Sequence, residues 1–445
     1  MTETLNKKIG NYRWTICALV FFATTINYLD RQVISLLKPY LEQAGLFGND
    51  PKSYESVYAN IVICFSIAYA LGMLLIGSVI DKFGTKIGYA ASLLGWSIAA
   101  IGHAIAKGPF GFGVARAALG IPEAGNFPAA NKTIAEWFPV KERALAIGLF
   151  NSGTNVGAII APLVVPLIAV AMGWQWAFII TGAIGLLWLL FWYKMYDSPE
   201  NKLMNGTLSQ SEYDYILSDK EAKVLADGEV EEKLSWFKLL GYRQTWAFFI
   251  GKLLTDPIWW FFLFWLPAFL KEQYGLTGTQ VAIPIALVYT MTTIGSIFGG
   301  WLPKRFIEGG MDSNKARKTA MFIYALFPIS VLFAQYLGGF SMWYAVIIIG
   351  IAASAHQAWS ANIFSTVSDM FPKRAIASVT GIGGMAGALG GIIIAKSAGL
   401  LFDHFKALGN IKIGYGIMFV VCALAYVSAW VIMHLLVPKF KKIDL

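Results

Sequence analysis

Residues 136–146 read EWFPVKERALA, and residues 369–377 read DMFPKRAIA, so one short motif occurs twice with a small insertion in the first copy. A glycine-rich apolar segment follows each copy. The glycines are Gly148, Gly153 and Gly157 after the first, and Gly381, Gly383, Gly384, Gly387, Gly390 and Gly391 after the second. This duplication predicts a chain of two similar halves. The Gly-x-x-x-Gly spacings in both segments predict faces on which helices pack closely.

The chain around these motifs is strongly apolar. Of its 445 residues, 57% are hydrophobic and only 14% are charged, and apolar stretches of membrane-spanning length recur throughout. The pattern predicts an all-α polytopic membrane protein with twelve helices, at 14–37, 56–80, 87–106, 110–136, 144–170, 174–193, 244–270, 279–302, 319–337, 342–368, 375–401 and 413–437. The polar stretch 197–241 separates six spans from six. We therefore expect an N-terminal half at 1–196, a linker at 197–241 and a C-terminal half at 242–445, with a substrate site between the halves.

Charge distribution predicts the orientation. With the N-terminus inside, the cytoplasmic segments hold 24 of the 35 Lys and Arg residues, which is the bias expected of cytoplasmic loops. Both termini are therefore expected in the cytoplasm. The first apolar run is too long for a cleavable signal peptide. The basic excess then reflects membrane topology, and no nucleic-acid partner is expected.

Asn27, Asp30 and Arg31 interrupt the first span. A guanidinium stays charged and costs about 2.5–3.5 kcal/mol at the centre of a bilayer on insertion scales, so it needs a partner, water or an anionic ligand. The three residues stand at i, i+3 and i+4, which places them on one helix face. A fixed cation beside a titratable carboxylate is what proton-driven anion import requires.

The fourth span carries a second pair of charges, Arg116 and Glu123, seven residues apart on one face. A carboxylate in a dry cavity resists ionisation until a cation approaches, so Glu123 is the leading candidate for the proton carrier, with Arg116 or Arg31 as the cation. The alternative is that Asp30, Arg31, Arg116 and Glu123 form a static ion network that holds the half together. Such networks rarely stabilise more than apolar packing does, which favours the functional interpretation.

The loop between the second and third spans resembles a motif of the major facilitator superfamily. Residues 77–86 read GSVIDKFGTK, similar to the family's cytoplasmic G-x-x-x-D-[RK]-x-G-[RK]-[RK] sequence, with Thr85 at one basic position. The matching residues are Gly77, Asp81, Lys82 and Gly84. The resemblance implies that they control the change between conformations, with Asp81 pairing to neighbouring helices. An ordinary glycine turn is the structural alternative.

Three further stretches resemble the anion:cation symporter family within that superfamily: NYLDRQ at 27–32, GIPEAGNFP at 120–128 and the motif at 136–143. That branch includes bacterial hexuronate and aldonate transporters, and residues 83–90 and 153–162 resemble the hexuronate carriers for glucuronate and galacturonate. The resemblance implies proton-coupled symport of a sugar acid. It also implies that Glu123 couples protonation to binding and that Asp30 is a second titrating site.

A sugar acid offers one carboxylate and several hydroxyls, so its site needs one cation and a set of neutral polar and aromatic groups. We expect Arg31 to bind the carboxylate. The family resemblance adds Tyr28, Tyr69 and Trp359 as contacts, although packing is the commoner role of a spanning aromatic. The remaining candidates are Asn151, Thr154, Trp260, Gln357 and Ser360. Lys252 and Asp256 stand at i, i+4 and are expected to neutralise each other or to line the cavity.

Enzyme chemistry finds little support in the sequence. There is no Walker sequence for ATP phosphates, no Gly-x-Ser-x-Gly nucleophile turn and no cluster with metal-ligand spacing. We therefore expect no cofactor beyond a proton gradient, a small sugar-acid anion as partner, a monomer, and a location in the bacterial inner membrane. The alternatives are an aldonate or other organic-anion carrier, an exchanger, sodium coupling, or a sugar-acid sensor with little transport.

Overall fold

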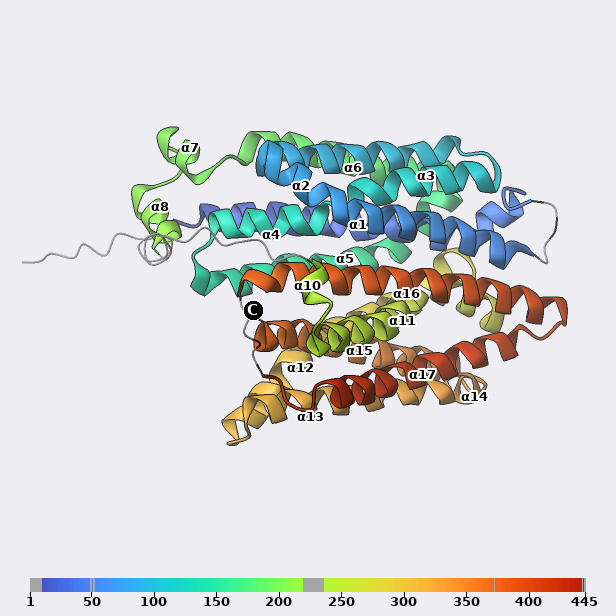
Figure 1. The fold of residues 1–445 in the computed structure, drawn as a ribbon. Helices are drawn as coiled ribbons and strands as arrows, with labels where there is room; N and C mark the ends of the chain where they lie inside the picture. Colours follow the sequence, from blue (N-terminus) through green and yellow to red (C-terminus); the bar gives the residue numbers. More distant parts are fainter. Residues whose placement is uncertain are drawn as a thin grey trace, which may run out of the picture.

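The structure is a computed structural model that describes residues 10–48, 50, 53–218, 236–371, 373–441 and 443. Every regular element in these residues is a helix (Figure 1). The N-terminal part contains α1 (Tyr12–Gln43), α2 (Tyr54–Gly102), α3 (Gly108–Glu123), α4 (Asn126–Trp137), α5 (Val140–Met172) and α6 (Trp174–Met195). The stretch expected to be the linker contains α7 (Pro199–Met204), α8 (Gln210–Leu217) and α10 (Trp236–Leu239). The C-terminal part contains α11 (Arg243–Tyr274), α12 (Ala282–Glu308), α13 (Ser313–Leu326), α14 (Ala334–Gly338), α15 (Met342–Met370), α16 (Lys373–Ala407) and α17 (Ile411–Leu436).

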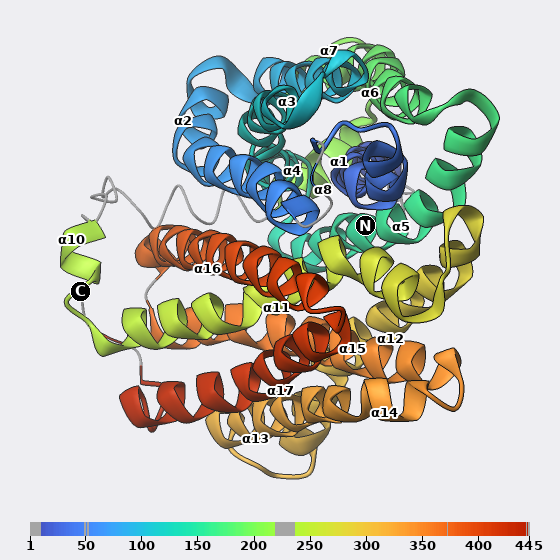
Figure 2. The ribbon, with the colours of Figure 1, turned by 90° about the vertical axis from the view of Figure 1, so that its right-hand side faces the viewer.

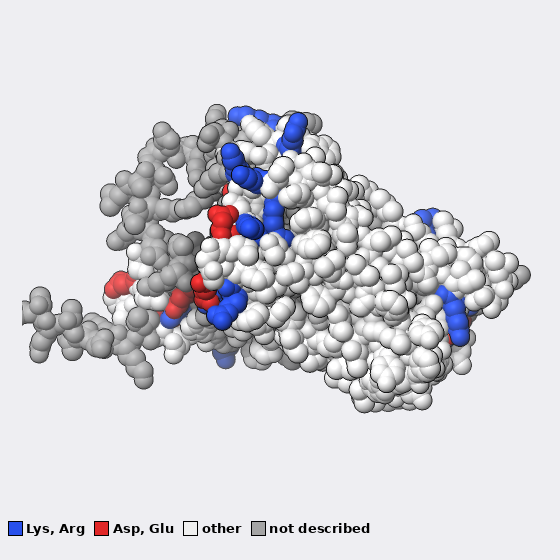
Figure 3. Space-filling model, turned by 90° about the horizontal axis from the view of Figure 1, so that it is seen from below, with Lys and Arg blue, Asp and Glu red and all other residues white. Residues whose placement is uncertain are grey.

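Ten helical segments of the described chain are long and apolar enough to cross a membrane. Two of them belong to α2, which bends at Gly84, where φ is +80°. Seen from one side, the charged side chains lie towards the two ends of the molecule, and a broad uncharged band separates them (Figure 3). That band is the surface expected of a membrane protein, because the hydrocarbon core excludes exposed charge.

The two remaining sequence-predicted spans, 14–37 and 110–136, are helical but do not meet these criteria. α1 is 32 residues long, so its polar composition and not its length sets it apart. The other span is divided into α3 and α4 by a turn at Ala124 and Gly125. Both carry the buried charges that the sequence marks as functional, and polar site residues lower the mean hydropathy of a spanning helix.

The helices form two groups that lie against each other, α1 to α6 in one and α11 to α17 in the other (Figure 2). Three helix pairs make the main contacts between them: α2 with α16, α5 with α12, and α1 with α11. The described chain begins and ends at the same end of the bundle, where α7 and α8 also lie (Figure 1). The opposite end is called the far end below.

Close helix packing within the first group depends on glycine. A Cβ at Gly153 of α5 would lie 2.6 Å from the carbonyl oxygen of Phe21 in α1, and one at Gly157 would collide with the carbonyl oxygen of Thr25. Without side chains at these positions the two backbones come into contact. The Gly-x-x-x-Gly prediction is therefore confirmed for α5, and this packing brings α1, with its charged residues, against the rest of the half.

A network of charges joins the two groups at the far end. Its members, the far-end cluster, are Lys38, Glu42, Glu55, Lys271, Glu272, Asp403 and Lys406. Lys271 of α11 lies 2.7 Å from Glu42 of α1. Asp403 of α16 accepts hydrogen bonds from the amides of Glu55 and Ser56, at 2.9 and 2.8 Å, and so caps the first turn of α2. At the end where the chain begins and ends, the ion pairs Arg13–Glu142, Lys86–Asp197 and Arg317–Asp369 each lie on one side of the boundary between the two groups.

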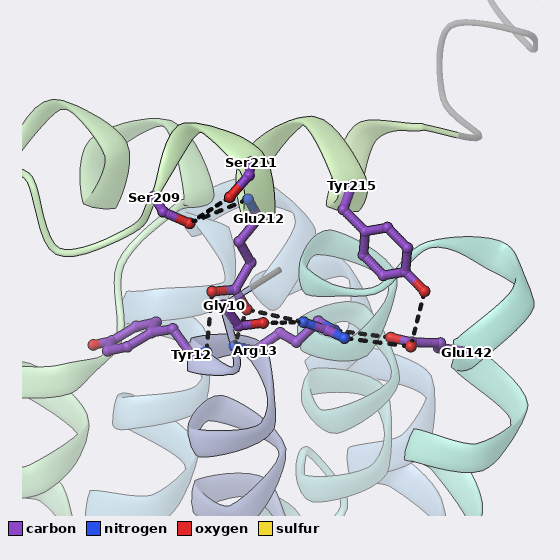
Figure 4. A network of polar contacts seen from close by, with 8 residues as sticks. All are labelled: Gly10, Tyr12, Arg13, Glu142, Ser209, Ser211, Glu212 and Tyr215. Atoms are coloured by element: carbon purple, nitrogen blue, oxygen red, sulfur yellow. Dashed lines mark hydrogen bonds and ion pairs between the residues drawn. The ribbon is translucent and has the colours of Figure 1, made fainter. Parts of the chain in front are cut away.

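Helix α8, in the stretch expected to be the linker, is attached to the first group of helices through Glu212 (Figure 4). The Glu212 carboxylate accepts hydrogen bonds from the backbone amides of Tyr12 and Arg13, at 3.1 and 3.0 Å, where α1 begins. A carboxylate at this position satisfies free amides and complements the positive end of the helix dipole. Arg13 in turn pairs with Glu142 of α5 at 2.8 Å, and Glu142 also accepts from Tyr215 of α8. The linker therefore holds the starts of α1 and α5 together.

The conformational motif lies at the bend of α2. The positive φ of Gly84 is a conformation that favours glycine, which explains this residue in the motif. After the bend, Thr85 donates a 2.6 Å hydrogen bond to Glu136, and Lys86 pairs with Asp197 at 2.7 Å. Burial opposes the charge on Asp197, but hydrogen bonds led by that from Lys86 outweigh it and lower the pKa of Asp197 to about 2. Lys82 is exposed. The side chain of Asp81 lies outside the part of the chain that the structure describes, so the roles of Gly77 and Asp81 stay predictions.

Candidate functional site

Arg31 is the centre of the site, and its charge is paired across the half. It is 2% exposed, and its Nε and Nη2 donate to the same carboxylate oxygen of Glu123, at 3.1 and 2.9 Å. Nη2 also donates to the side-chain oxygen of Asn27 at 3.2 Å. The counter-charge that lets Arg31 lie inside the membrane is therefore Glu123. Asp30, its neighbour in sequence, does not pair with it.

Four aromatic rings surround the guanidinium. Its central carbon lies 4.8 Å from the ring centres of Tyr28 and Tyr69, 5.2 Å from that of Phe65 and 5.4 Å from that of Trp260. Contacts of this kind stabilise a cation in place of water. Trp260 comes from α11, so both halves contribute to the cage. The aromatic groups fix the position of Arg31 without neutralising it, so within the described chain its counter-charge is Glu123 alone.

Glu123 reaches Arg31 because of where α3 ends. Helix α3 ends at Glu123, directly after Pro122. The chain then turns through Ala124 and Gly125 before α4 begins. α3 lies close to α2 at this level, because a Cβ at Gly120 would lie 2.6 Å from the carbonyl oxygen of Phe65. The Glu123 carboxyl is fully buried, and its second oxygen has no hydrogen-bond partner among the described residues. That free oxygen is where a proton can bind.

Arg116 and Asp30 lie beside this pair without joining it. Arg116, 1% exposed, donates from Nη2 to the carbonyl oxygen of Arg31 at 3.0 Å and rests against Phe65. Its other two nitrogens have no hydrogen-bond partner in the described chain. Asp30 is 2% exposed, and neither of its oxygens is within hydrogen-bond geometry of a described group. Of these four charged side chains, only Arg31 and Glu123 form an ion pair with each other in the described chain, and whether the four act as a static network stays an open alternative.

Several sequence candidates lie apart from Arg31. Thr154 donates to the carbonyl oxygen of Asn151, and the Asn151 side chain is exposed. Trp359 is fully buried and packs edge-on against Tyr426. Gln357 and Ser360 are half-buried, without a side-chain hydrogen bond to any described residue. In the described chain none of these five residues makes a hydrogen bond or ring contact with Arg31, and their roles in binding remain predictions.

The polar residues of α11 and α15 form a second group. Lys252 and Asp256 pair at 2.7 Å within α11, which confirms the expected i, i+4 interaction. His356 of α15 stacks on Trp259 and shares a 2.7 Å hydrogen bond with Tyr426. It is therefore a packed histidine. Lys396 of α16 donates to Asn60 of α2 at 3.0 Å.

Two residues that were not predicted from the sequence make contacts at or near the site. Phe65 contacts both Arg31 and Arg116, yet a phenylalanine in an apolar span carries no sequence signal of that role. Asn155 accepts a 3.3 Å hydrogen bond from Thr292 of α12 and so joins the two halves inside the membrane. A buried amide one residue after Thr154 was a detectable signal. Among the described residues no group of side chains is arranged to hold a metal ion.

This geometry would allow a carboxylate ligand to replace Glu123 as the partner of Arg31. A carboxylate ligand and the Glu123 carboxylate compete for the same guanidinium, and protonation of Glu123 removes one competitor. Both Arg31 and Glu123 are closed to solvent, so a ligand reaches them only when the halves move.

Known proteins match this chain over most of its length. The model of the Major Facilitator Superfamily matches residues 20–395. The chain belongs to this superfamily. The hexuronate transporter of Escherichia coli K12 is 32% identical, covering 94% of this chain and 92% of that protein. The galacturonate transporter of Dickeya chrysanthemi is 35% identical over 67% of this chain and 84% of that protein, and the D-galactonate transporter of Escherichia coli O6:H1 is 29% identical over 95% and 94%.

The fold agrees with solved structures of the same kind. A crystal structure of a D-xylose-proton symporter superimposes with a TM-score of 0.74 at 16% identity, covering 97% of this chain and 99% of that one. The protein is therefore a multi-pass membrane transporter of the inner membrane and not an enzyme. At this identity the structural match supports the fold alone.

Proposed function

We propose that this protein is a proton-coupled symporter that imports a hexuronate anion, such as glucuronate or galacturonate, by alternating access. The observation that carries the proposal is the single buried Arg31–Glu123 pair inside an aromatic cage built by both halves. One cation matches one substrate carboxylate, and aromatic rings suit the apolar faces of a sugar. Relatives named for hexuronate and galacturonate transport support this substrate class.

In the proposed cycle, a proton from outside binds Glu123 and releases Arg31, which then accepts the substrate carboxylate. The neutral Glu123 favours the loaded state, and its ionisation on the inner side returns it to Arg31 and displaces the substrate. Asp30 is a candidate for a second proton, and Arg116 orients the backbone at Arg31. Neither Arg116 nor the cage residues change charge in this scheme.

We further propose twelve membrane spans, with α1 and the α3–α4 pair added to the ten apolar segments, and with both termini in the cytoplasm. The halves would then be 1–196 and 242–445, joined by a linker at 197–241. In this orientation the far-end cluster closes the outer side of the protein.

Uptake into proteoliposomes tests the proposal. Purified protein should accumulate labelled galacturonate when the lumen is more alkaline than the outside, and a protonophore should abolish the accumulation. Accumulation that persists after the proton gradient collapses, or that requires sodium, would contradict proton coupling. Specific binding without flux would instead identify a sensor.

D-Galactonate is the second candidate substrate, because a D-galactonate transporter is similar to this chain over nearly its whole length. An aldonate carries the same single carboxylate, so the cage alone does not separate the two. Competition between labelled galacturonate and unlabelled galactonate ranks them directly. Stronger competition by galactonate than by unlabelled galacturonate would assign the aldonate as substrate.

A further inference from the structure

A second charged pair lies near the Arg31 cage on the C-terminal half. Lys252, Asp256 and Trp260 stand at i, i+4 and i+8 on α11 and so follow one face of that helix. Trp260 belongs to the cage, where it contacts Arg31 and meets Tyr69 edge-on. Asp256 therefore lies one turn from the cage, about 6 Å along the helix axis. An extended six-carbon substrate held by Arg31 spans a comparable length.

The pair is neutral as a whole, but its two members are not equally accessible. Lys252 is 6% exposed, lies 4.3 Å from the ring centre of Phe364 and donates to one oxygen of Asp256. The Asp256 side chain is 18% exposed, and its other oxygen has no partner among the described residues. Of the two groups, the accessible one is therefore a carboxylate oxygen of Asp256. The ammonium group of Lys252 is more deeply buried.

The facing helix leaves room for this carboxylate. A Cβ at Gly387 of α16 would collide with Asp256, and one at Gly391 would lie 3.7 Å from Trp260. One turn along α11 from Asp256, Trp260 contacts the rings of Phe65 and Tyr69 in the other half. The Asp256 carboxylate thus lies where the two halves meet, on the same side of α11 as the cage.

We propose that Asp256 is a charge filter that restricts this transporter to sugar acids with one carboxylate. Its free oxygen accepts hydrogen bonds from substrate hydroxyls and repels a second carboxylate at the far end of a six-carbon diacid. Because Asp256 neutralises Lys252, this pair offers no free cation to that second carboxylate. This inference rests on the proposed function, since it takes Arg31 as the partner of the first carboxylate.

Galacturonate and galactarate form a matched pair of probes, because they share the sugar stereochemistry and differ in whether carbon 1 is a carboxylate. Wild-type proteoliposomes should take up galacturonate and exclude galactarate. Asp256→Asn should raise the ratio of galactarate to galacturonate uptake by about tenfold or more, because Lys252 becomes an unneutralised cation at the site and the charge repulsion is lost. The double substitution Asp256→Asn with Lys252→Met removes that cation and should reverse the gain.

The double variant separates a charge effect from a loosened site, because a loosened site would keep accepting galactarate. Asp312→Asn is the matched control: it makes the same chemical change at an exposed helix cap, where asparagine also caps well, and should leave the ratio unchanged. If Asp256→Asn inserts but does not transport, galactarate competition against labelled galacturonate binding in detergent gives the same comparison.

Wild-type uptake of both acids at equal rates would overturn the filter while leaving the proposed function intact. Continued exclusion of galactarate by Asp256→Asn, in uptake and in binding, would also overturn it. If the wild-type protein takes up neither acid, the proposed function itself fails. The three results are distinct in a single series of measurements.

Discussion

At the scale of single residues, Arg31 is held by contacts that a lysine cannot reproduce. Its two nitrogens donate to one oxygen of Glu123 while a third contact reaches Asn27, and the flat guanidinium lies among four rings. A lysine ammonium is a compact, strongly hydrated charge that offers no planar fork. The position of the charge in the cage therefore depends on arginine here, and so does the carboxylate affinity that we propose for it.

Arg31→Lys should raise the KM for galacturonate by about tenfold or more, since a point charge replaces a bidentate donor. Because the positive charge is kept, the protein should still insert and remain folded, which the melting temperature in detergent checks. The measurement is initial uptake at limiting substrate. Near-normal uptake under that condition would remove Arg31 from the substrate site.

Glu123→Gln should abolish accumulation of galacturonate against its gradient but retain exchange of internal for external substrate. The neutral glutamine imitates protonated Glu123, so the loaded transporter can still cross between its two states but cannot release a proton. Exchange and gradient-driven uptake are measured in the same vesicles. Full accumulation by this variant would exclude Glu123 as the proton carrier.

At the scale of helices, positions without side chains decide which elements touch. Gly153 and Gly157 let α5 contact the backbone of α1, and Gly120 does the same between α3 and α2. These contacts bring Arg31, Phe65 and Glu123 to one point from three different helices. The turn after Pro122 then ends α3 at the level of the guanidinium.

Gly153→Ala should destabilise the protein by about 1–3 kcal/mol, the usual cost of adding atoms where there is no space, and lower its melting temperature in detergent. Gly148→Ala is the matched control on the same helix, since a Cβ there meets no atom within 4 Å. That variant should be neutral or slightly stabilising, because alanine favours helix over glycine by roughly 0.5–1 kcal/mol. Equal melting temperatures for the two variants would contradict the packing argument.

At the scale of the whole molecule, ion pairs and a charged helix cap join the two halves at the far end. The buried hydrogen bond from Thr292 to Asn155 joins them near the middle. Lys271–Glu42 and the capping of α2 by Asp403 each join one half to the other. Helices that move as two rigid groups must break these contacts when that end opens. The far-end cluster therefore contributes to the balance between the two states of the transporter.

Asp403→Asn should shift this balance towards opening of the far end, because a charged cap on the α2 amides becomes a weaker neutral one. The distance between spin labels at Ala44 and Leu408, on opposite halves, should show a larger population at long separation. Asp312→Asn should leave the distribution unchanged. An unchanged distribution in Asp403→Asn would show that the cap does not hold the far end closed.

Much of the architecture could be read from the sequence because it depends on local patterns. All twelve predicted spans are helical in the described chain, since apolar runs of that length leave the backbone few alternatives in a bilayer. The boundary between α3 and α4 was not predicted. A turn at Ala124 and Gly125 depends on packing against α2 that no local pattern reveals.

The sequence by itself determined which residues carry charge within the spans and that the motif before the glycine-rich helices is duplicated. It did not determine the pairing of those charges. The partner of Arg31 is Glu123, 92 positions away, rather than its neighbour Asp30, and the cage includes Phe65 and Trp260 from two other helices. Spacing along one helix specifies which side chains share a face. Contacts between helices depend on how closely their backbones pack, and in this protein glycines and a helix end in the tertiary structure decided that.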